Sequence, residues 1–266
     1  MLEAIKFVVK EHVDNRKMIM HLAIENVNQQ TIRTSFGVFW LYFRDIMYFV
    51  VYTLFRVLTS GGGEIMGINP IVYLLVGLIP FFFMNEVLNR GTAAIKNNKS
   101  IIQSIKFPIT TIPAIDVLTI FFQRIFTFVV LVVIVYAFGY GKMINYFKVI
   151  YFMIAMLVCM FILNLIISAF VAVSTDFHQL YMSLMRILIF ICPVIWAFDK
   201  IESPILNVIL HLNPLAYVIS GFRNAFVWGG MPSMIYTIYF WLCMIVLLLL
   251  GCRIQYKLRK FYADFI

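Results

Sequence analysis

Four charged side chains lie inside long apolar stretches of the sequence and are its first candidates for chemistry. They are Arg44, Asp45, Arg124 and Arg186. If these stretches cross a membrane, a charge that faces lipid is unfavourable by several kcal/mol, whereas a charge that is paired or hydrated is tolerated. We therefore predict that these groups pair with one another or face a wet interior.

The residue patterns of membrane enzymes are missing from the sequence. Its histidines are isolated and never stand four residues apart: His12, His21, His178 and His211. Because neither an H-E-x-x-H motif nor a G-x-x-x-x-G-K-[ST] phosphate loop occurs, we expect no catalytic site, no metal site and no ATP hydrolysis by this chain alone. The carboxylates near the middle of the apolar stretches are Asp45 and Asp116. Two such groups are few for a secondary transporter coupled to protons.

The composition excludes a water-soluble domain. Hydrophobic residues make up 63% of the 266 residues and charged residues only 12%, whereas soluble domains carry roughly 25% charged residues. Three uncharged runs, 65–85, 149–175 and 224–252, are long enough for helices that cross roughly 30 Å of hydrocarbon. They are apolar on every face, unlike the alternating strands of a membrane barrel. The expected fold class is an all-α membrane protein.

We predict six transmembrane helices. Their ranges are 36–58, 70–90, 113–138, 147–173, 180–198 and 233–253. Thirteen of the 21 lysines and arginines then lie before the first span, between the second and third, or after the sixth, and five lie on the alternate side. Since basic residues concentrate on the cytosolic side, both termini are expected in the cytosol.

Two segments complete the predicted organisation. Residues 1–35 place apolar and basic positions at helical spacing, which favours a cytosolic amphipathic segment in the membrane interface. Residues 36–266 then form one transmembrane domain with a cytosolic C-terminal tail. The uncharged stretch 203–222 contains prolines and polar side chains that would disrupt a seventh span, so we predict two short external re-entrant helices hinged at Asn213 and Pro214.

The first predicted span is rich in aromatic residues. Four of its side chains form one helical stripe: Phe36, Phe39, Phe43 and Met47. One interpretation is packing against a neighbouring helix or lipid. The other is a row of rings along a passage for a flat sugar face or an isoprenoid chain.

The loop 96–113 resembles a short amphipathic cytosolic helix closed by Pro108. Its apolar ridge consists of Ile101, Ile102 and Ile105, flanked by Lys99 and Lys106. Such a ridge can insert into a groove of a cytosolic partner, or the helix can lie on anionic lipid.

Several short motifs in a fixed order resemble one known family. They are Ser35 to Trp40, Gly77 to Phe82, Asn97 to Pro113, Asp176 with Phe177, Cys192 to Trp196, and Asn213 to Leu215 with Arg223. Across nearly the whole chain they are similar to permease subunits of type-two ABC exporters that move lipid-linked cell-envelope polysaccharides, including O-antigen, capsule and teichoic acid. Each motif alone is weak, and their order and spacing carry the resemblance.

The resemblance implies a homodimer in the bacterial plasma membrane, with a separate ATPase subunit docked under each half. ATP and Mg would be used by that ATPase, so this chain is expected to bind no cofactor itself, and no nucleic acid. The channel aromatics would be Phe36, Phe39, Trp40, Phe43, Phe190 and Trp196. The ATPase-coupling residues would be Lys99, Ile101, Ile102, Ile105, Lys106 and Phe107. Asn213, Pro214 and Arg223 would belong to the external re-entrant segment.

The expected function is therefore ATP-driven translocation of a lipid-linked polysaccharide from the cytosolic to the external face. Basic residues near the cytosolic entrance would attract the lipid pyrophosphate, and the candidates are Arg16, Lys17 and Arg33. Their alternative interpretation is plain positive-inside charge. Three other functions stay open at this point: a drug or peptide exporter of the same fold, a membrane-embedded enzyme that modifies lipids or glycans, and a structural scaffold.

Overall fold

The computed structural model describes residues 1–32, 39–60, 63–93, 107–173, 175–196, 203, 208 and 210–259. Its helices are α1 (Leu2–Asp14), α2 (Arg16–Ile32), α3 (Phe39–Ser60), α4 (Pro70–Gly91), η1 (Ile109–Thr111), α7 (Ile112–Ala137), η2 (Gly141–Met143), α8 (Tyr146–Val173), α9 (Thr175–Ile191), α11 (Pro214–Arg223), η4 (Asn224–Trp228) and α12 (Met234–Leu258). Within these residues the only extended pairing is a bridge between Ile65 and Ile68. The predicted all-α class is therefore confirmed for the described part of the chain.

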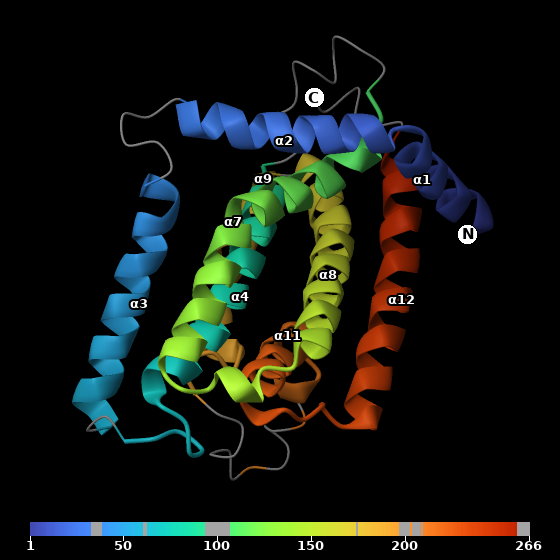
Figure 1. Ribbon diagram of the computed structural model, residues 1–266. Coiled ribbons are helices and arrows are strands. Elements are labelled where there is room, and N and C mark those ends of the chain that lie inside the picture. The colour runs from blue at the N-terminus through green and yellow to red at the C-terminus, as the bar shows by residue number, and fades with distance from the viewer. Residues whose placement is uncertain are drawn as a thin grey trace.

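Four of the described helices are long and apolar enough to cross a membrane, namely α4, α7 together with η1, α8 and α12. They stand side by side in one bundle (Figure 1) and match the predicted spans 70–90, 113–138, 147–173 and 233–253. The predicted spans 36–58 and 180–198 fall on α3 and α9. Neither helix is among the four, because α3 carries three charged residues and α9 has 17 residues.

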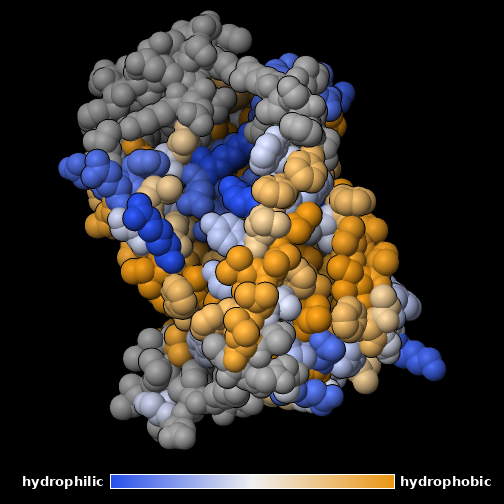
Figure 2. Space-filling model, turned by 90° about the vertical axis from the view of Figure 1, so that its left-hand side faces the viewer, coloured by the Kyte–Doolittle hydropathy of each residue, from blue (hydrophilic) through white to orange (hydrophobic). Residues whose placement is uncertain are grey.

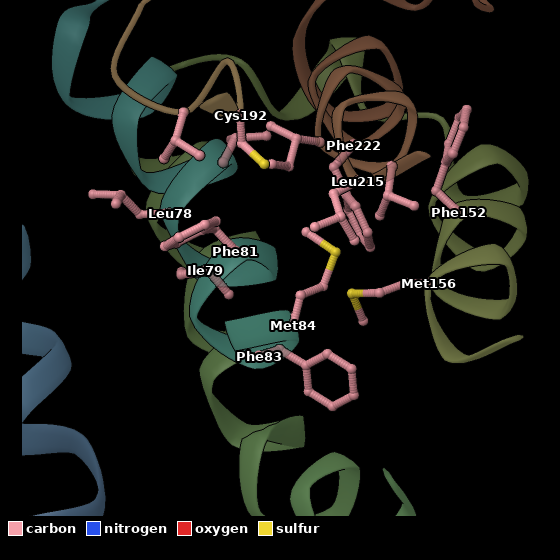
Figure 3. Close-up of a cluster of buried hydrophobic side chains, with 14 of the residues drawn as sticks. Leu78, Ile79, Phe81, Phe83, Met84, Phe152, Met156, Cys192, Leu215 and Phe222 are labelled. Carbon is pink, nitrogen blue, oxygen red and sulfur yellow. The ribbon is translucent and has the colours of Figure 1, made fainter. Parts of the chain in front are cut away.

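Helix α4 is the central helix of the bundle. Within its most apolar 18-residue window, 78% of the residues are buried. Its first turn is fixed locally, since the Asn69 side chain accepts a hydrogen bond from the N–H of Ile71 at 2.9 Å and Pro70 is preset for a helical φ. Figure 3 shows its side chains Leu78, Ile79, Phe81, Phe83 and Met84 in one apolar cluster with Phe152 and Met156 of α8 and Leu215 and Phe222 of α11.

Helices α1 and α2 lie across one end of the bundle (Figure 1). α2 packs on the start of α7, where Ile19 and Ala23 are buried with Ile115. α1 packs on the C-terminal end of α12, where Val8 is buried with Cys252. The segment predicted for residues 1–35 thus contains two helices that each cover protein, and α1 and the end of α12 lie at the same end of the molecule.

Helix α11 lies at the opposite end and packs between α4 and α8 (Figure 1). Asn213 caps its start, accepting a hydrogen bond from the N–H of Leu215 at 3.0 Å, and Pro214 occupies the first turn. The helix continues into the π-helical turn η4, which ends at Gly229 with a φ of +66°, a conformation that glycine adopts readily. The hinge predicted at Asn213 and Pro214 is the beginning of this short buried helix.

Candidate functional site

A cleft of about 340 Å³ opens between α3, α4 and α9. Figure 2 views the molecule from the α3 side and shows hydrophilic side chains gathered in a hollow, in the half of the bundle nearer α2. The lining residues come from all three helices: Arg44, Asp45, Tyr48, Tyr52, Phe81, Phe82, Asn85, Glu86, Asn89, Met182, Met185, Arg186 and Ile189. A polar hollow in an otherwise apolar helix bundle is the default candidate for a functional site.

A buried arginine holds the two carboxylates of the cleft. Arg124 of α7 is only 3% exposed, and its Nε donates to Glu86 Oε2 of α4 at 2.8 Å. Its terminal nitrogens also donate to Glu86 and to Asp45 of α3. This cation therefore joins three helices, and the pairing predicted for Asp45 and Arg124 is confirmed.

Glu86 is a correction to the sequence analysis, which restricted the mid-span carboxylates to Asp45 and Asp116. It lies near the end of the predicted span 70–90, directly after the uncharged run 65–85. The sequence does carry a signal for Glu86. Asn85 and Asn89 stand at helical spacing beside it and indicate a polar face of the helix. Asp116 is paired outside the cleft, with its Oδ1 3.3 Å from the Nε of Arg90.

Two further arginines border the cleft. The side chain of Arg44 is 62% exposed and lies 3.9 Å from both Asp45 and Glu86, a distance at which attraction is weak. Arg186 of α9 is exposed, lines the cleft, and forms no ion pair among the described residues. Both arginines thus line the cleft with exposed side chains, and whether they face a wet interior in the membrane stays a prediction.

Amides and aromatic rings complete the lining. Asn89 donates to Asn85 Oδ1 at 3.2 Å, while its own Oδ1 is buried without a hydrogen-bond partner in the described part of the chain. The rings of Tyr48 and Tyr52 are stacked with centroids 6.3 Å apart, and Tyr48 also contacts Phe82 at 5.8 Å. Polar groups beside ring faces are suited to hydroxyl-bearing or anionic ligands.

A second hollow, a groove of about 400 Å³, continues along α3. Its lining residues are Trp40, Phe43, Arg44, Met47, Tyr48 and Val51. Two predicted channel aromatics, Trp40 and Phe43, therefore line one groove, and Phe39 contacts Phe43 with ring centroids 5.2 Å apart. Phe36 lies outside the described residues.

The other two predicted channel aromatics lie at the far end of α9. Phe190 is 64% exposed and Trp196 is half-buried, and the indole N–H of Trp196 donates to the Phe190 carbonyl at 2.9 Å. Neither residue lines the cleft or the groove. The five described members of the predicted set are thus divided between two places in the structure.

Beyond Trp196, a buried arginine joins the motifs near the end opposite α2. Arg223 donates to the carbonyls of Pro193 and Val194, the latter at 2.6 Å, and its guanidinium lies 3.7 Å from the centroid of the Tyr73 ring. Tyr73 in turn donates to the Trp196 carbonyl at 3.1 Å.

Two other motif residues complete this Arg223 cluster. Gly77 leaves room for the guanidinium, since a Cβ there would lie 2.6 Å from Arg223 Nη2. Asn213 donates to the Sγ of Cys192 at 3.4 Å. Three of the motifs identified separately in the sequence, those of Gly77, of Cys192, and of Asn213 with Arg223, therefore meet at one place.

Comparison with known proteins identifies the family. Residues 21–227 match the family described as ABC-2 type transporter. The chain belongs to the ABC-2 type transporter family. The resemblance to this class of exporter predicted from the sequence is confirmed.

This ABC-2 transporter chain is also similar to two curated proteins, both described as O-antigen export system permease protein RfbA. The protein from Myxococcus xanthus is 20% identical over 230 residues, which cover 85% of this chain and 86% of the relative. The protein from Klebsiella pneumoniae is 25% identical over 226 residues, which cover 84% and 83% of the two chains.

The segments of the ABC-2 chain predicted to contact an ATPase lie mostly outside the described residues, which exclude Lys99, Ile101, Ile102, Ile105 and Lys106. Phe107, where the description resumes, is half-buried beside Ile19 and Ile115. Thr110 follows it and donates to Glu11 Oε2 of α1 at 2.5 Å. The exit of the predicted docking loop is therefore held by both N-terminal helices.

The basic residues predicted at the lipid entrance lie on or beside α2. Arg16 and Lys17 are exposed in its first turn, and Arg33 is outside the described residues. They do not line the cleft. Among the described residues, no group of three or more His, Cys, Asp and Glu side chains could hold a metal ion.

Proposed function

We propose that this chain is the transmembrane subunit of an ATP-driven exporter that moves a lipid-linked polysaccharide, of the O-antigen, capsule or teichoic acid type, from the cytosolic to the external face of a bacterial plasma membrane. The observation that carries the proposal is the ABC-2 family match, together with two similar proteins that are named as O-antigen export permeases. The polar cleft inside the bundle supports it.

The proposed topology has six crossings, with α3 as the first and α9 as the fifth. Even parity places both termini on one side, and the position of α1 beside the end of α12 agrees with this. The excess of lysine and arginine on that side makes it the cytosolic side. In this topology α11 is an external re-entrant helix, supported by its short length and its burial between α4 and α8.

The energy source in this proposal is a separate ATPase subunit, one under each half of a homodimer. The absence of a phosphate-binding loop from the sequence means that ATP hydrolysis has to come from elsewhere. The loop 99–107 is the proposed docking segment. Its exit contacts α1 and α2, so movement of the ATPase would reach the bundle through these helices.

The cargo explains why a polar interior is needed. Hydroxyl and phosphate groups lose hydrogen bonds to water when they enter hydrocarbon, and this cost prevents spontaneous crossing. Tyr48, Tyr52 and Phe82 offer ring faces on which the C–H faces of sugars stack, and Asn85 and Asn89 offer amide groups for hydroxyls. Stacking tolerates a change of sugar, so a repeating polymer can slide.

Affinity purification of the tagged chain in mild detergent tests the partner. We expect a soluble ATPase to copurify, and the complex to hydrolyse ATP. Ile101→Asp combined with Ile105→Asp is expected to abolish copurification. The control is Met143→Asp, an exposed apolar-to-acid change in η2 at the opposite end, which should leave it intact. Recovery of the chain alone in several detergents would reject the ATPase-driven mechanism.

The cargo is tested separately by depleting the chain in its own cell. We expect lipid-linked polysaccharide to accumulate on the cytosolic face, measured by its resistance to an external glycosidase. Normal surface polysaccharide together with internal accumulation of a drug or peptide would instead identify a different cargo for the same fold.

A further inference from the structure

The polar cleft and the apolar groove form one continuous amphipathic surface. Arg44 and Tyr48 line both hollows, so the two meet along α3. The cleft contributes charged and amide groups, whereas the groove contributes Trp40, Phe43 and Met47. A ligand that fills both must have an anionic or polar head and an apolar chain.

The balance of charge in the cleft decides the sign of the head. Asp45 and Glu86 are both engaged by the buried Arg124, so neither carboxylate is open to a cationic ligand. The two remaining charged groups are Arg44, which has only loose contacts at 3.9 Å, and Arg186, which has no ion pair among the described residues. Two exposed guanidinium groups on facing walls favour an anion, and phosphate accepts hydrogen bonds from arginine in a bidentate way.

We propose that the cleft binds the phosphate group of a lipid between Arg44 of α3 and Arg186 of α9, while the hydrocarbon chain of the same lipid lies in the α3 groove. Asn89 lines the same cleft and adds an amide group to its polar wall. The inference rests on the proposed function, because it locates the phosphate of the cargo inside the bundle. It adds a site separate from Arg16 and Lys17 on α2.

Binding of a short polyprenyl pyrophosphate tests this site without ATP hydrolysis or transport. The full-length chain, with any copurified partner, is placed in phosphatidylcholine nanodiscs and titrated with radiolabelled farnesyl pyrophosphate. We expect Arg186→Gln and Arg44→Gln each to weaken binding about ten-fold, because each removes a charge-assisted contact. Arg186→Lys should bind more tightly than Arg186→Gln but less tightly than the unmodified chain, since it keeps the charge and loses the bidentate contact.

The matched control is Arg253→Gln, the same charge change at an exposed position on α12, on the other side of the bundle. It should bind like the unmodified chain. Labelled farnesol, which lacks the phosphates, should bind equally weakly to all variants. Wild-type affinity for farnesyl pyrophosphate in both Arg186→Gln and Arg44→Gln would overturn the proposal, as would equal losses in Arg253→Gln.

Competition identifies the natural source of the phosphate. If farnesyl pyrophosphate still binds when phosphatidylglycerol replaces phosphatidylcholine in the nanodiscs, a polyprenyl carrier is supported as the occupant. Displacement by phosphatidylglycerol, lost in Arg186→Gln, supports the same site with a membrane phospholipid. If inorganic pyrophosphate displaces farnesyl pyrophosphate and binds with equal affinity, the proposal of a lipid ligand is overturned, because the groove would then contribute nothing to binding. If the site binds but no ATPase copurifies, the exporter proposal fails and the lipid site stands.

Discussion

At the scale of the residue, Arg223 shows how a charge can be buried without an acid beside it. Among the described residues its partners are two backbone carbonyls and the face of Tyr73. The carbonyls of Pro193 and Val194 belong to the turn that follows α9, where the regular helical hydrogen bonds end. Arg223 thus supplies the donors that this turn lacks.

Replacing Arg223 by methionine is expected to destabilise the protein by about 2–4 kcal/mol, because two buried carbonyls lose a charged donor. The measurement is thermal or denaturant unfolding of the purified protein in detergent, followed by tryptophan fluorescence. Lys142→Met in the exposed turn η2 is the control and should change little. An unchanged unfolding curve for Arg223→Met would show that the carbonyls find other donors.

Gly77→Ala should lower the stability by part of the same amount, since the added Cβ would displace the Arg223 guanidinium from the two carbonyls. In the Arg223→Met background the alanine is expected to be neutral or stabilising, because the colliding atom is gone and alanine favours the helix. The double-mutant cycle therefore predicts strong coupling. Gly230→Ala, with open space around its Cβ, is the matched control. Additive effects of Gly77→Ala and Arg223→Met would contradict the direct contact.

At the scale of the element, Arg124 connects α3 to the rest of the bundle. It lies on α7 and binds Asp45 of α3 and Glu86 of α4. α3 also donates a hydrogen bond from Tyr42 to the Gln123 carbonyl at 2.7 Å, again on α7. A helix with three charged residues in an apolar environment is therefore held by specific polar contacts as well as by packing.

Arg124→Met should destabilise the fold by about 3–5 kcal/mol, because two carboxylates are left in a poorly hydrated site without their cation. Adding Asp45→Asn and Glu86→Gln is expected to recover much of the loss, since the uncompensated charges are then removed. Unfolding in detergent measures both effects, and Arg253→Met serves as a control. If the triple variant were no more stable than Arg124→Met, the charge explanation would be wrong.

At the scale of the whole molecule, the features that depend on sequence-local chemistry were predictable. Long apolar stretches identified α4, α7, α8 and α12, and the turn residues Asn213 and Pro214 identified the start of α11. The cost of a charge in lipid predicted that the four charged side chains inside the apolar stretches would pair with one another or face a wet interior, and Asp45 and Arg124 do pair. These inferences use only the local composition and the cost of burying a charge.

Features that depend on tertiary packing were not predictable in the same way. Glu86 completes the charged cluster only because α4 and α7 lie side by side, and no spacing in the sequence records this contact. Likewise, Phe190 and Trp196 share the aromatic type of Phe43 but lie elsewhere, because Phe190 is in the last turn of α9 and Trp196 follows that helix. The ATPase-docking residues 99–106 lie outside the described part of the chain, and their role stays a prediction.

The proposed passage is tested by Phe39→Ala combined with Phe43→Ala. We expect surface polysaccharide to fall several-fold, because one ring of the α3 groove and the ring that contacts it are removed, while assembly and stability change little at these partly exposed positions. Export is measured by antibody labelling of intact cells. The control pair is Phe138→Ala with Phe147→Ala, two exposed rings at the end opposite α2. Normal export in the test pair would remove these rings from the passage.

The burial of α4 has a consequence for how freely its sequence can vary. Its apolar window is 78% buried, whereas that of α12 is 22% buried, although both helices have the hydropathy of membrane spans. On α12 a substitution has to satisfy lipid, so any residue of comparable hydropathy should serve. On α4 a substitution has to fit neighbouring side chains, so volume and shape decide. Two helices that look alike on a hydropathy plot should therefore accept different sets of residues. Hydropathy limits the choice on the outer helix α12, and side-chain shape limits it on the central helix α4.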